Sequence, residues 1–241
     1  MASYVGIDGC KAGWFVVTLI DRRGWKINVF NNVEEIWKNL SYATLLLIDI
    51  PIGLHDTGDK SRSCDIEARR LLGSPRTSSV FTPPLRPALE FVERVKASEK
   101  NHLLSARRIG VQTWGIVSKI REVDHFLRRV LEARKKIREV HPEVLFWALN
   151  AGKAMSNNKS QRQGFEERLQ VLRKHFSASD ALLEEALSAF PRKIVARDDI
   201  IDALAAAVTA LNGDGNLSSI SERPERDGFG LPMEMVYYFQ S

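Results

Sequence analysis

The first fifty residues alternate between apolar runs and short polar turns, a pattern that predicts β-strands. Three such runs, at residues 3–8, 14–20 and 25–30, follow one another closely. Short turns between consecutive strands predict an antiparallel meander. Residues 33–40 place their apolar side chains on one face, which predicts a short amphipathic helix. The run at 44–50 is almost wholly apolar and predicts a strand buried on both faces.

The rest of the chain is dominated by helical periodicity. Prolines cluster within residues 53–113, where we expect an insertion of loops with one helix at 64–72. The segment 199–211 is apolar nearly all round, which is typical of a helix buried against a sheet. The other predicted elements are a long helix over 116–130, a short strand at 138–141, helices near 161–175 and 180–189, and a final strand at 234–239.

This order of elements predicts an α/β fold. Three antiparallel strands are followed by strands that alternate with helices, so the sheet should be mixed, with helices on both faces. The length of 241 residues suits one domain over residues 1–241, interrupted by the insertion at about 53–113.

The composition changes this picture little. Hydrophobic residues make up 44% and charged residues 27%, as is ordinary for a soluble globular protein. No window approaches the roughly 18 consecutive apolar residues of a membrane span, and the N-terminus lacks the pattern of a secretory signal. Cys10 and Cys64 are too few for a disulfide framework. We therefore expect a cytoplasmic protein without membrane association.

The charge leaves two interpretations open. The formal charge is +5, with 35 Lys and Arg against 30 Asp and Glu. Cations are concentrated between Arg121 and Arg138, where few acids offset them. They form either a solvated helix face or a track for a phosphate backbone, and the composition does not choose between the two.

Four aspartates stand where apolar residues would be expected. Asp8 closes the first strand, Asp49 interrupts the buried fourth strand, and Asp199 and Asp202 share one face of the last helix. Buried carboxylates need hydrogen bonds, a cation or a proton, and oxygen ligands suit Mg²⁺ or Mn²⁺. Structural explanations exist as well, since Asp8 could belong to a turn and Asp199 could cap its helix. Taken together, the four predict a shared metal site.

Two further segments carry candidate chemistry. In the segment 139–143, His141 could orient a water or a phosphate, and Glu143 could assist the metal site. Pro142 and Glu143 also suit the start of a helix, so a structural role is an equal alternative. In the proline-rich insertion, guanidinium and hydroxyl groups could bind phosphate oxygens or could be ordinary surface residues. These insertion residues are Arg69, Arg76, Ser78 and Ser79.

Several common motifs are missing. The chain has no Gly-x-x-x-x-Gly-Lys-Ser/Thr loop, no Gly-x-Gly-x-x-Gly after the first strand and no Gly-x-Ser-x-Gly elbow. Its cysteines and histidines form no zinc pattern. The missing P-loop speaks against an ordinary P-loop nucleotidase, and the other absences reduce the number of enzyme classes that the sequence can match.

Six ordered blocks, and a seventh near the C-terminus, resemble the domain-of-unknown-function family 429. The blocks are residues 6–14, 48–54, 64–73, 78–81, 139–143, 198–207 and 230–234. That family is described as predicted nucleases of the ribonuclease-H fold. The resemblance therefore implies a ribonuclease-H-like mixed sheet and nuclease chemistry, and it fixes the fold better than the activity.

RuvC-type Holliday-junction resolvases are a more distant comparison. They carry an Asp on the first strand, an acid at the end of the fourth and Asp-x-x-Asp-Ala-Leu-Ala on the last helix; Asp8, Asp49 and residues 199–205 are similar. Asp49 departs from the Glu of the resolvases, and its shorter side chain would move a ligand by roughly one bond length. The insertion and the segment 139–143 are also foreign to resolvases, which leaves the substrate open.

The leading hypothesis from the sequence is metal-dependent hydrolysis of phosphodiester bonds in RNA or DNA, with the four aspartates as ligands of two ions. The first alternative is a nucleotide or other small phosphorylated substrate on the same fold. The second is a binding module without catalysis. A closed pocket under the insertion would favour a small ligand, and an open basic groove would favour nucleic acid. The sequence leaves open whether the protein is a monomer or a homodimer.

Overall fold

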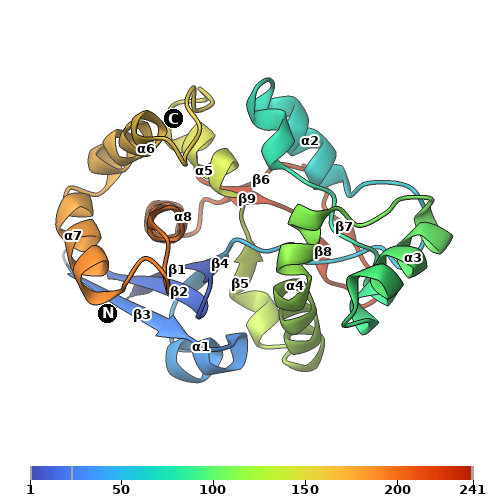
Figure 1. The fold of residues 1–241 in the computed structure, drawn as a ribbon. Coiled ribbons are helices and arrows are strands. Elements are labelled where there is room, and N and C mark those ends of the chain that lie inside the picture. The colour runs from blue at the N-terminus through green and yellow to red at the C-terminus, as the bar shows by residue number, and fades with distance from the viewer. Residues whose placement is uncertain (1, 23, 240–241) are drawn as a thin grey trace.

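A five-stranded mixed sheet forms the centre of the computed structural model, which describes residues 2–22 and 24–239 (Figure 1). The strands are β1 (Ser3–Cys10), β2 (Gly13–Ile20), β3 (Gly24–Phe30), β4 (Leu45–Ile48) and β5 (Ile137–Glu139), in the order β3-β2-β1-β4-β5. The first three pair antiparallel, whereas β4 runs parallel to β1 and β5 parallel to β4. The predicted α/β fold is confirmed, and its mixed sheet is of the ribonuclease-H-like kind.

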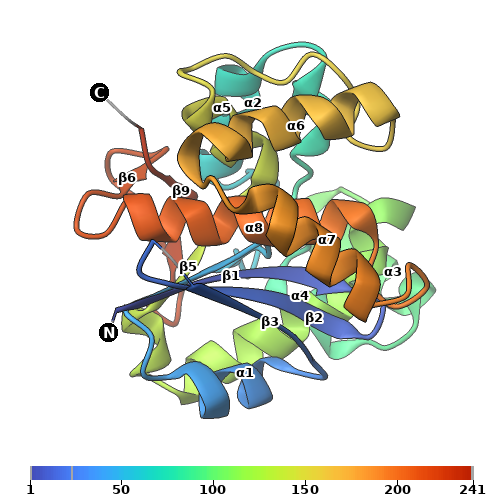
Figure 2. The ribbon, with the colours of Figure 1, turned by 90° about the vertical axis from the view of Figure 1, so that its left-hand side faces the viewer.

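Helices cover both faces of the sheet (Figure 2). On one face lie α1 (Val33–Leu40) and α4 (Val111–Arg129), and α8 (Arg197–Asn212) lies against the other. Three further helices surround α8: α5 (Pro142–Leu149), α6 (Arg162–His175) and α7 (Ser179–Ala189). Each face buries its own apolar cluster, and full burial of one large aliphatic side chain contributes about 1.5–3 kcal/mol.

The two faces follow the two-residue period of the strands. On β1, Val5 and Ile7 pack into the cluster beneath α1 and α4. Gly6 and Asp8 therefore face α8. The alternation along β1 therefore directs Asp8, at the carboxyl end of the strand, toward α8, the helix that carries two further acids.

Gly6 allows α8 to lie directly on the backbone of β1. A Cβ at Gly6 would lie 2.0 Å from the carbonyl oxygen of Ala203 and 2.3 Å from the backbone nitrogen of Ala207. α8 buries nearly every residue after its first turn, as its apolar pattern predicts. This close packing fixes the first turns of α8 above the strand ends.

The insertion contains more helix than the sequence predicts. The predicted helix is present as α2 (Ser63–Leu72), but α3 (Arg94–Ser105) occupies a segment expected to be loop. The residues that α3 buries are small or polar, so no apolar stripe marks the helix. It is held instead by Asn101, which accepts from the Leu85 N–H and donates to the Arg107 carbonyl, both at 2.8 Å. Short 3₁₀ turns span Arg76–Ser79, Arg86–Glu90 and, before β5, Ala133–Lys135.

Two boundaries bear on the candidate acids. β1 continues to Cys10, so Asp8 pairs with Phe15 inside the ladder and does not lie in the hairpin turn. β4 ends at Ile48, which places Asp49 just beyond the strand.

The segment after α8 forms two small ribbons. β6 (Ser218–Ser219) pairs with β9 (Val236–Tyr237), and β7 (Glu225–Arg226) pairs with β8 (Pro232–Met233). The predicted final strand at 234–239 is therefore only two residues long. Within the residues described, no helix combines the length and apolarity that a membrane span requires.

Candidate functional site

Asp8 and Asp49 lie at the carboxyl ends of neighbouring parallel strands. The register pairs Ile7 with Ile48, and the Asp49 N–H donates to the Ile7 carbonyl at 3.0 Å. Leu47 packs into the cluster around α8, so Asp49, two residues later, faces the same side. Ligands of open α/β sheets commonly bind beyond this edge of the sheet.

The first turns of α8 supply two more acids. Asp199 accepts the Ala196 N–H at 2.8 Å, so the capping role considered from the sequence is present. Asp202 lies one turn further, is only 2% exposed, and precedes the Ala203 that contacts Gly6. The strand ends and the helix thus bring the four predicted acids into one region.

Burial and neighbouring negative charges raise the pKa values of these acids. Burial raises the pKa of Asp8 well above its usual range, and the charges of Asp49, Asp202 and Asp199 raise it further. Burial and then the Asp202 charge raise the pKa of Asp49 to about 7. The pKa of Asp199 is raised to about 6, chiefly by burial, with the Asp202 charge adding to it. Carboxylates that repel one another in this way favour a cation among them.

Lys159 supplies one positive charge to this region. Its ammonium donates to Asp202 Oδ2. The Asp202 charge, followed by those of Asp8 and Asp49, raises the pKa of the half-buried Lys159. The other carboxylate oxygen of Asp202, Oδ1, is buried without a hydrogen-bond partner. No sequence pattern distinguishes Lys159, which lies in a polar loop without periodicity.

A cavity of about 500 Å³ is lined by Asp8, Asp49 and Lys159, whereas Asp199 and Asp202 are not among its lining residues. Residues between 75 and 81 of the insertion form another wall. α4 adds Lys119, whose aliphatic chain would lie 2.8 Å from a Cβ at Gly9. The insertion thus covers part of the cavity, as a small ligand would require.

His141 and Glu143 both line this cavity. Burial lowers the pKa of His141 to about 4; its Nε2 lies 3.3 Å from the Ser79 carbonyl oxygen, and its Nδ1 is buried without a partner. Glu143 pairs with Arg168, while its Oε2 is buried and unpartnered. Both residues therefore keep one polar atom for a ligand.

The four predicted phosphate-binding residues of the insertion separate into two groups. Arg76, Ser78 and Ser79 line the cavity, and the Nε of Arg76 is buried without a partner. Arg69 is not part of the cavity wall. Its guanidinium donates at 2.8 Å to the Val80 carbonyl and to the Thr82 hydroxyl, so it holds the loop instead of a substrate.

A buried arginine network also borders the cavity. Arg62 is 1% exposed and pairs with Asp65 at 2.6 Å and with Glu139 at 2.7 Å. Donor atoms of Cys64, Asp65 and Glu139 lie within 4.8 Å of one another. Because the guanidinium already occupies both carboxylates, we interpret this group as an ion network and not as a metal site. No local pattern indicates this pairing of Arg62 with Asp65 and Glu139, although Asp65 lies in the block of residues 64–73.

The residues at the strand ends and on α8 fit a divalent cation. The four carboxylates outnumber the two nearby ammonium groups, those of Lys159 and Lys119, and Asp202 Oδ1 is a buried acceptor without a partner among the described residues. All of the candidate donors are oxygens, which is the donor set of Mg²⁺ or Mn²⁺.

The chain matches one known protein family over most of its length. The family model described as "Protein of unknown function (DUF429)" matches residues 6–226. The chain belongs to this family. No curated protein and no solved structure shows a match to the chain. Membership covers all four aspartates of the candidate site and assigns no activity to them.

The basic segment of this DUF429 protein, between Arg121 and Arg138, contacts mainly protein acceptors. Arg129 pairs with Glu34 and Arg138 with Glu234. Arg121 donates to the Phe91 carbonyl at 2.6 Å. Further contacts are made by Arg128 to Asp124, by Arg134 to the Phe229 carbonyl and by Lys136 to the Ser41 carbonyl. None of these cations lines the acidic cavity, so the segment does not form a phosphate track leading to it.

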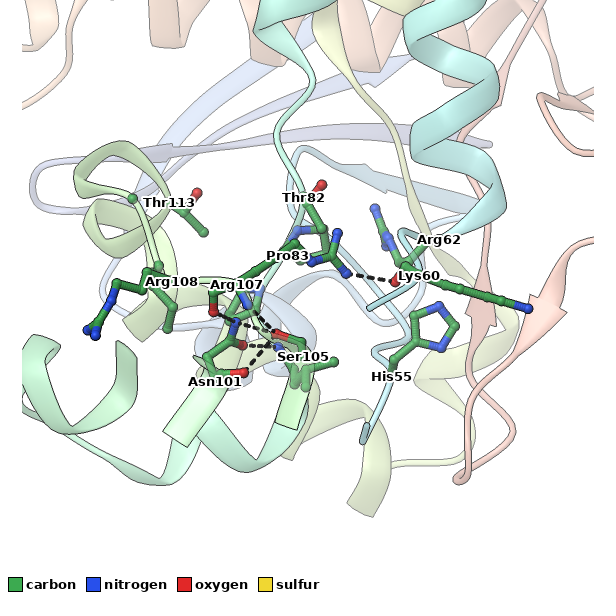
Figure 3. A pocket seen from close by; sticks show the side chains of 14 residues that line it. His55, Lys60, Arg62, Thr82, Pro83, Asn101, Ser105, Arg107, Arg108 and Thr113 are labelled. Carbon is green, nitrogen blue, oxygen red and sulfur yellow. Dashed lines mark hydrogen bonds between the residues drawn. The ribbon is translucent and has the colours of Figure 1, made fainter. Parts of the chain in front are cut away.

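A second cavity, of about 70 Å³, lies between the insertion and the start of α4 (Figure 3). Its walls include His55, Lys60, Arg107 and Arg108. Arg107 donates to the Ser61 hydroxyl at 3.1 Å and to the Lys60 carbonyl at 3.0 Å. Figure 3 shows the side chains of Lys60 and Arg108 extending to opposite sides. These cations do not converge on one point, so we do not assign a ligand to this cavity.

Proposed function

We propose that the acidic cavity is the active site of a divalent-metal-dependent hydrolase of phosphate esters, with Mg²⁺ or Mn²⁺ as the metal. The proximity of Asp8, Asp49, Asp199 and Asp202, of which Asp8 and Asp49 line the cavity of about 500 Å³, carries this proposal. Closed ion networks normally satisfy every buried acceptor, whereas Asp202 Oδ1 has no partner among the residues that the structure describes.

The surrounding residues have roles that their environments allow. Asp8 and Asp49 would hold the metal, which when bound supplies Lewis acidity and lowers the pKa of its water. His141, with a pKa of about 4, is neutral near pH 7; its Nε2 donates to the Ser79 carbonyl, which leaves Nδ1 as an acceptor that would orient a water. Arg76 and Ser79 line the side of the cavity formed by the insertion, where a phosphate oxygen would find donors.

The size of the cavity favours a substrate no larger than a nucleotide at the reacting end. Pockets of about 300–1,000 Å³ commonly bind small molecules, and this one is partly covered by the insertion. The basic segment of residues 121–138 is engaged with protein acceptors, so it offers little to a duplex. We therefore propose nucleotides, or the terminal nucleotide of a single strand, as substrates. Nuclease action on strand ends stays within this proposal.

Hydrolysis measured against a panel of substrates tests the proposal. We expect Mn²⁺-dependent release of products from nucleotides or single-stranded oligonucleotide ends, and slower cleavage of a blunt duplex. The double variant Asp8→Asn with Asp202→Asn should lose about a hundredfold or more, since removal of one preorganised electrostatic group commonly costs that much. Asp59→Asn, an exposed acid of the insertion, is the matched control.

Equal rates for wild type and the double variant would show that this cavity is not the active site. Cleavage of duplex DNA in its interior, at a rate above that of strand ends, would refute the proposed substrate while leaving metal-dependent hydrolysis in place.

A further inference from the structure

We propose that the acidic cavity binds one divalent ion instead of two, and that the ammonium of Lys159 supplies the second positive charge at Asp202. This inference rests on the proposed function only in requiring that the cluster binds a divalent ion. It revises the two-ion site expected from the sequence, and it assigns Lys159 a role that no motif indicates.

The contact between Lys159 and Asp202 is the first observation. The ammonium donates to Asp202 Oδ2, and the Asp202 side chain is 1% exposed. Lys159 also lines the cavity together with Asp8 and Asp49. The ammonium therefore lies beside the carboxylates that a second divalent ion would need as ligands.

The spacing of the carboxylates is the second observation. Among residues 2–22 and 24–239, no three of the four aspartates offer oxygens that all lie within 4.8 Å of one another. Asp8 and Asp49 follow the paired residues Ile7 and Ile48 at the ends of two adjacent strands, and both line the cavity. Mg²⁺ usually takes one or two carboxylates and keeps several waters, so this pair suits a single ion and leaves Asp202 to the lysine.

The loop that carries Lys159 is the third observation. Glu167 on α6 accepts the Ser156 N–H at 2.7 Å and the Asn157 N–H at 2.9 Å. Arg168 donates to the Asn157 carbonyl at 3.0 Å and pairs with Glu143 in the cavity wall. The loop is thus anchored immediately before Lys159, so the ammonium is positioned by the fold.

The same loop packs closely on the start of α6. A Cβ at Gly164 would lie 2.0 Å from the carbonyl oxygen of Asn158. This approach leaves little room for the backbone beside Lys159 to withdraw toward α6. The fold therefore holds the backbone of Lys159 in place at the site.

Counting bound Mn²⁺ by electron paramagnetic resonance at pH 8 tests the proposal. Wild type should bind one ion per chain. Lys159→Met removes the charge at similar length, so a second ion should bind at the freed Asp202 and the count should double. Lys159→Met with Asp202→Asn should return to one ion. Lys153→Met, an exposed lysine of the same loop, is the matched control and should bind one.

Folding of each variant is checked by its thermal unfolding, and Lys159→Arg, which keeps the charge, should behave as wild type. Two ions on the wild type, or one ion on Lys159→Met, would overturn the role of Lys159 while leaving the proposed function intact. No Mn²⁺ on the wild type would refute both.

Discussion

Asp49 combines, in one carboxyl group, burial and neighbouring negative charge. Both effects raise its pKa, to about 7, against an ordinary value of 3.8. Between about pH 4 and pH 7 the folded protein therefore holds a proton at this site that the unfolded chain releases. Stability conferred in this way is present at low pH and is lost as pH rises through the folded-state pKa.

Removing this charge should stabilise the metal-free protein at high pH. In EDTA, Asp49→Asn should unfold with a free energy higher than wild type at pH 8, and the two should be similar near pH 4. The expected gain is on the order of 1–3 kcal/mol, because one pKa unit corresponds to about 1.4 kcal/mol and neighbours absorb part of the shift. Urea unfolding at both pH values measures it. A wild-type protein whose stability rises from pH 5 to 8 would contradict the raised pKa.

At the scale of single residues, the sequence indicated the acidic residues of the site but not its basic residue, Lys159. Asp49 and Asp202 stood out because apolar neighbours surround them; the structure buries Asp202 and half-buries Asp49. Lys159 follows Asn157 and Asn158 in a polar loop, where a lysine is the ordinary residue. Its position depends on contacts with Glu167 and Asp202, which are distant in sequence and leave no local signal.

At the scale of elements, the contact between α8 and β1 decides where the acids meet. Gly6→Ala would place a Cβ 2.0 Å from the Ala203 carbonyl oxygen, so the helix must shift or the protein must lose stability. We expect a loss of about 1–3 kcal/mol, the usual cost of overpacking, together with weaker Mn²⁺ binding. Thermal unfolding and Mn²⁺ titration measure the two effects.

Gly115→Ala is the control for this prediction. Gly115 lies on the exposed side of α4, and a Cβ there would meet nothing within 4 Å. It should stabilise the protein by about 0.5–1 kcal/mol, as alanine does in a helix interior. If Gly6→Ala were as stable as Gly115→Ala and bound Mn²⁺ equally, the close packing of α8 would not position the acids.

Elements with a regular apolar period were predicted, and those without one were not. The strand pattern of residues 3–30 and the apolar α8 correspond to observed elements. α3 was missed because it buries small and polar residues such as Ser98 and Asn101, whose hydrogen bonds with the insertion replace an apolar stripe. Sequence patterns detect burial of apolar surface, and this helix is fixed by polar contacts instead.

At the scale of the whole molecule, the topology places the site and the insertion shapes it. β1 and β4 end together at one edge of the sheet, and α8 crosses above that edge with two further acids. The sequence predicted this meeting of acids because the topology follows from the order of elements. Arg76, Ser78 and Ser79 were substrate-binding candidates from the sequence, but how residues 75–81 cover the cavity depends on long-range contacts such as that of His141 with Ser79, which leave no local signal.

The most direct test of the central claim is the stabilisation of the protein by Mn²⁺ at pH 8. An ion that binds only the folded state at a hundred times its Kd adds about 2.7 kcal/mol, or roughly 5–10 °C in Tm for a chain of this length. We predict such a rise for wild type and no rise for the double variant Asp8→Asn with Asp49→Asn. In EDTA, the Tm of this double variant should be no lower than that of wild type. An equal rise in the double variant, or none in the wild type, would contradict the assignment of these acids as one metal site.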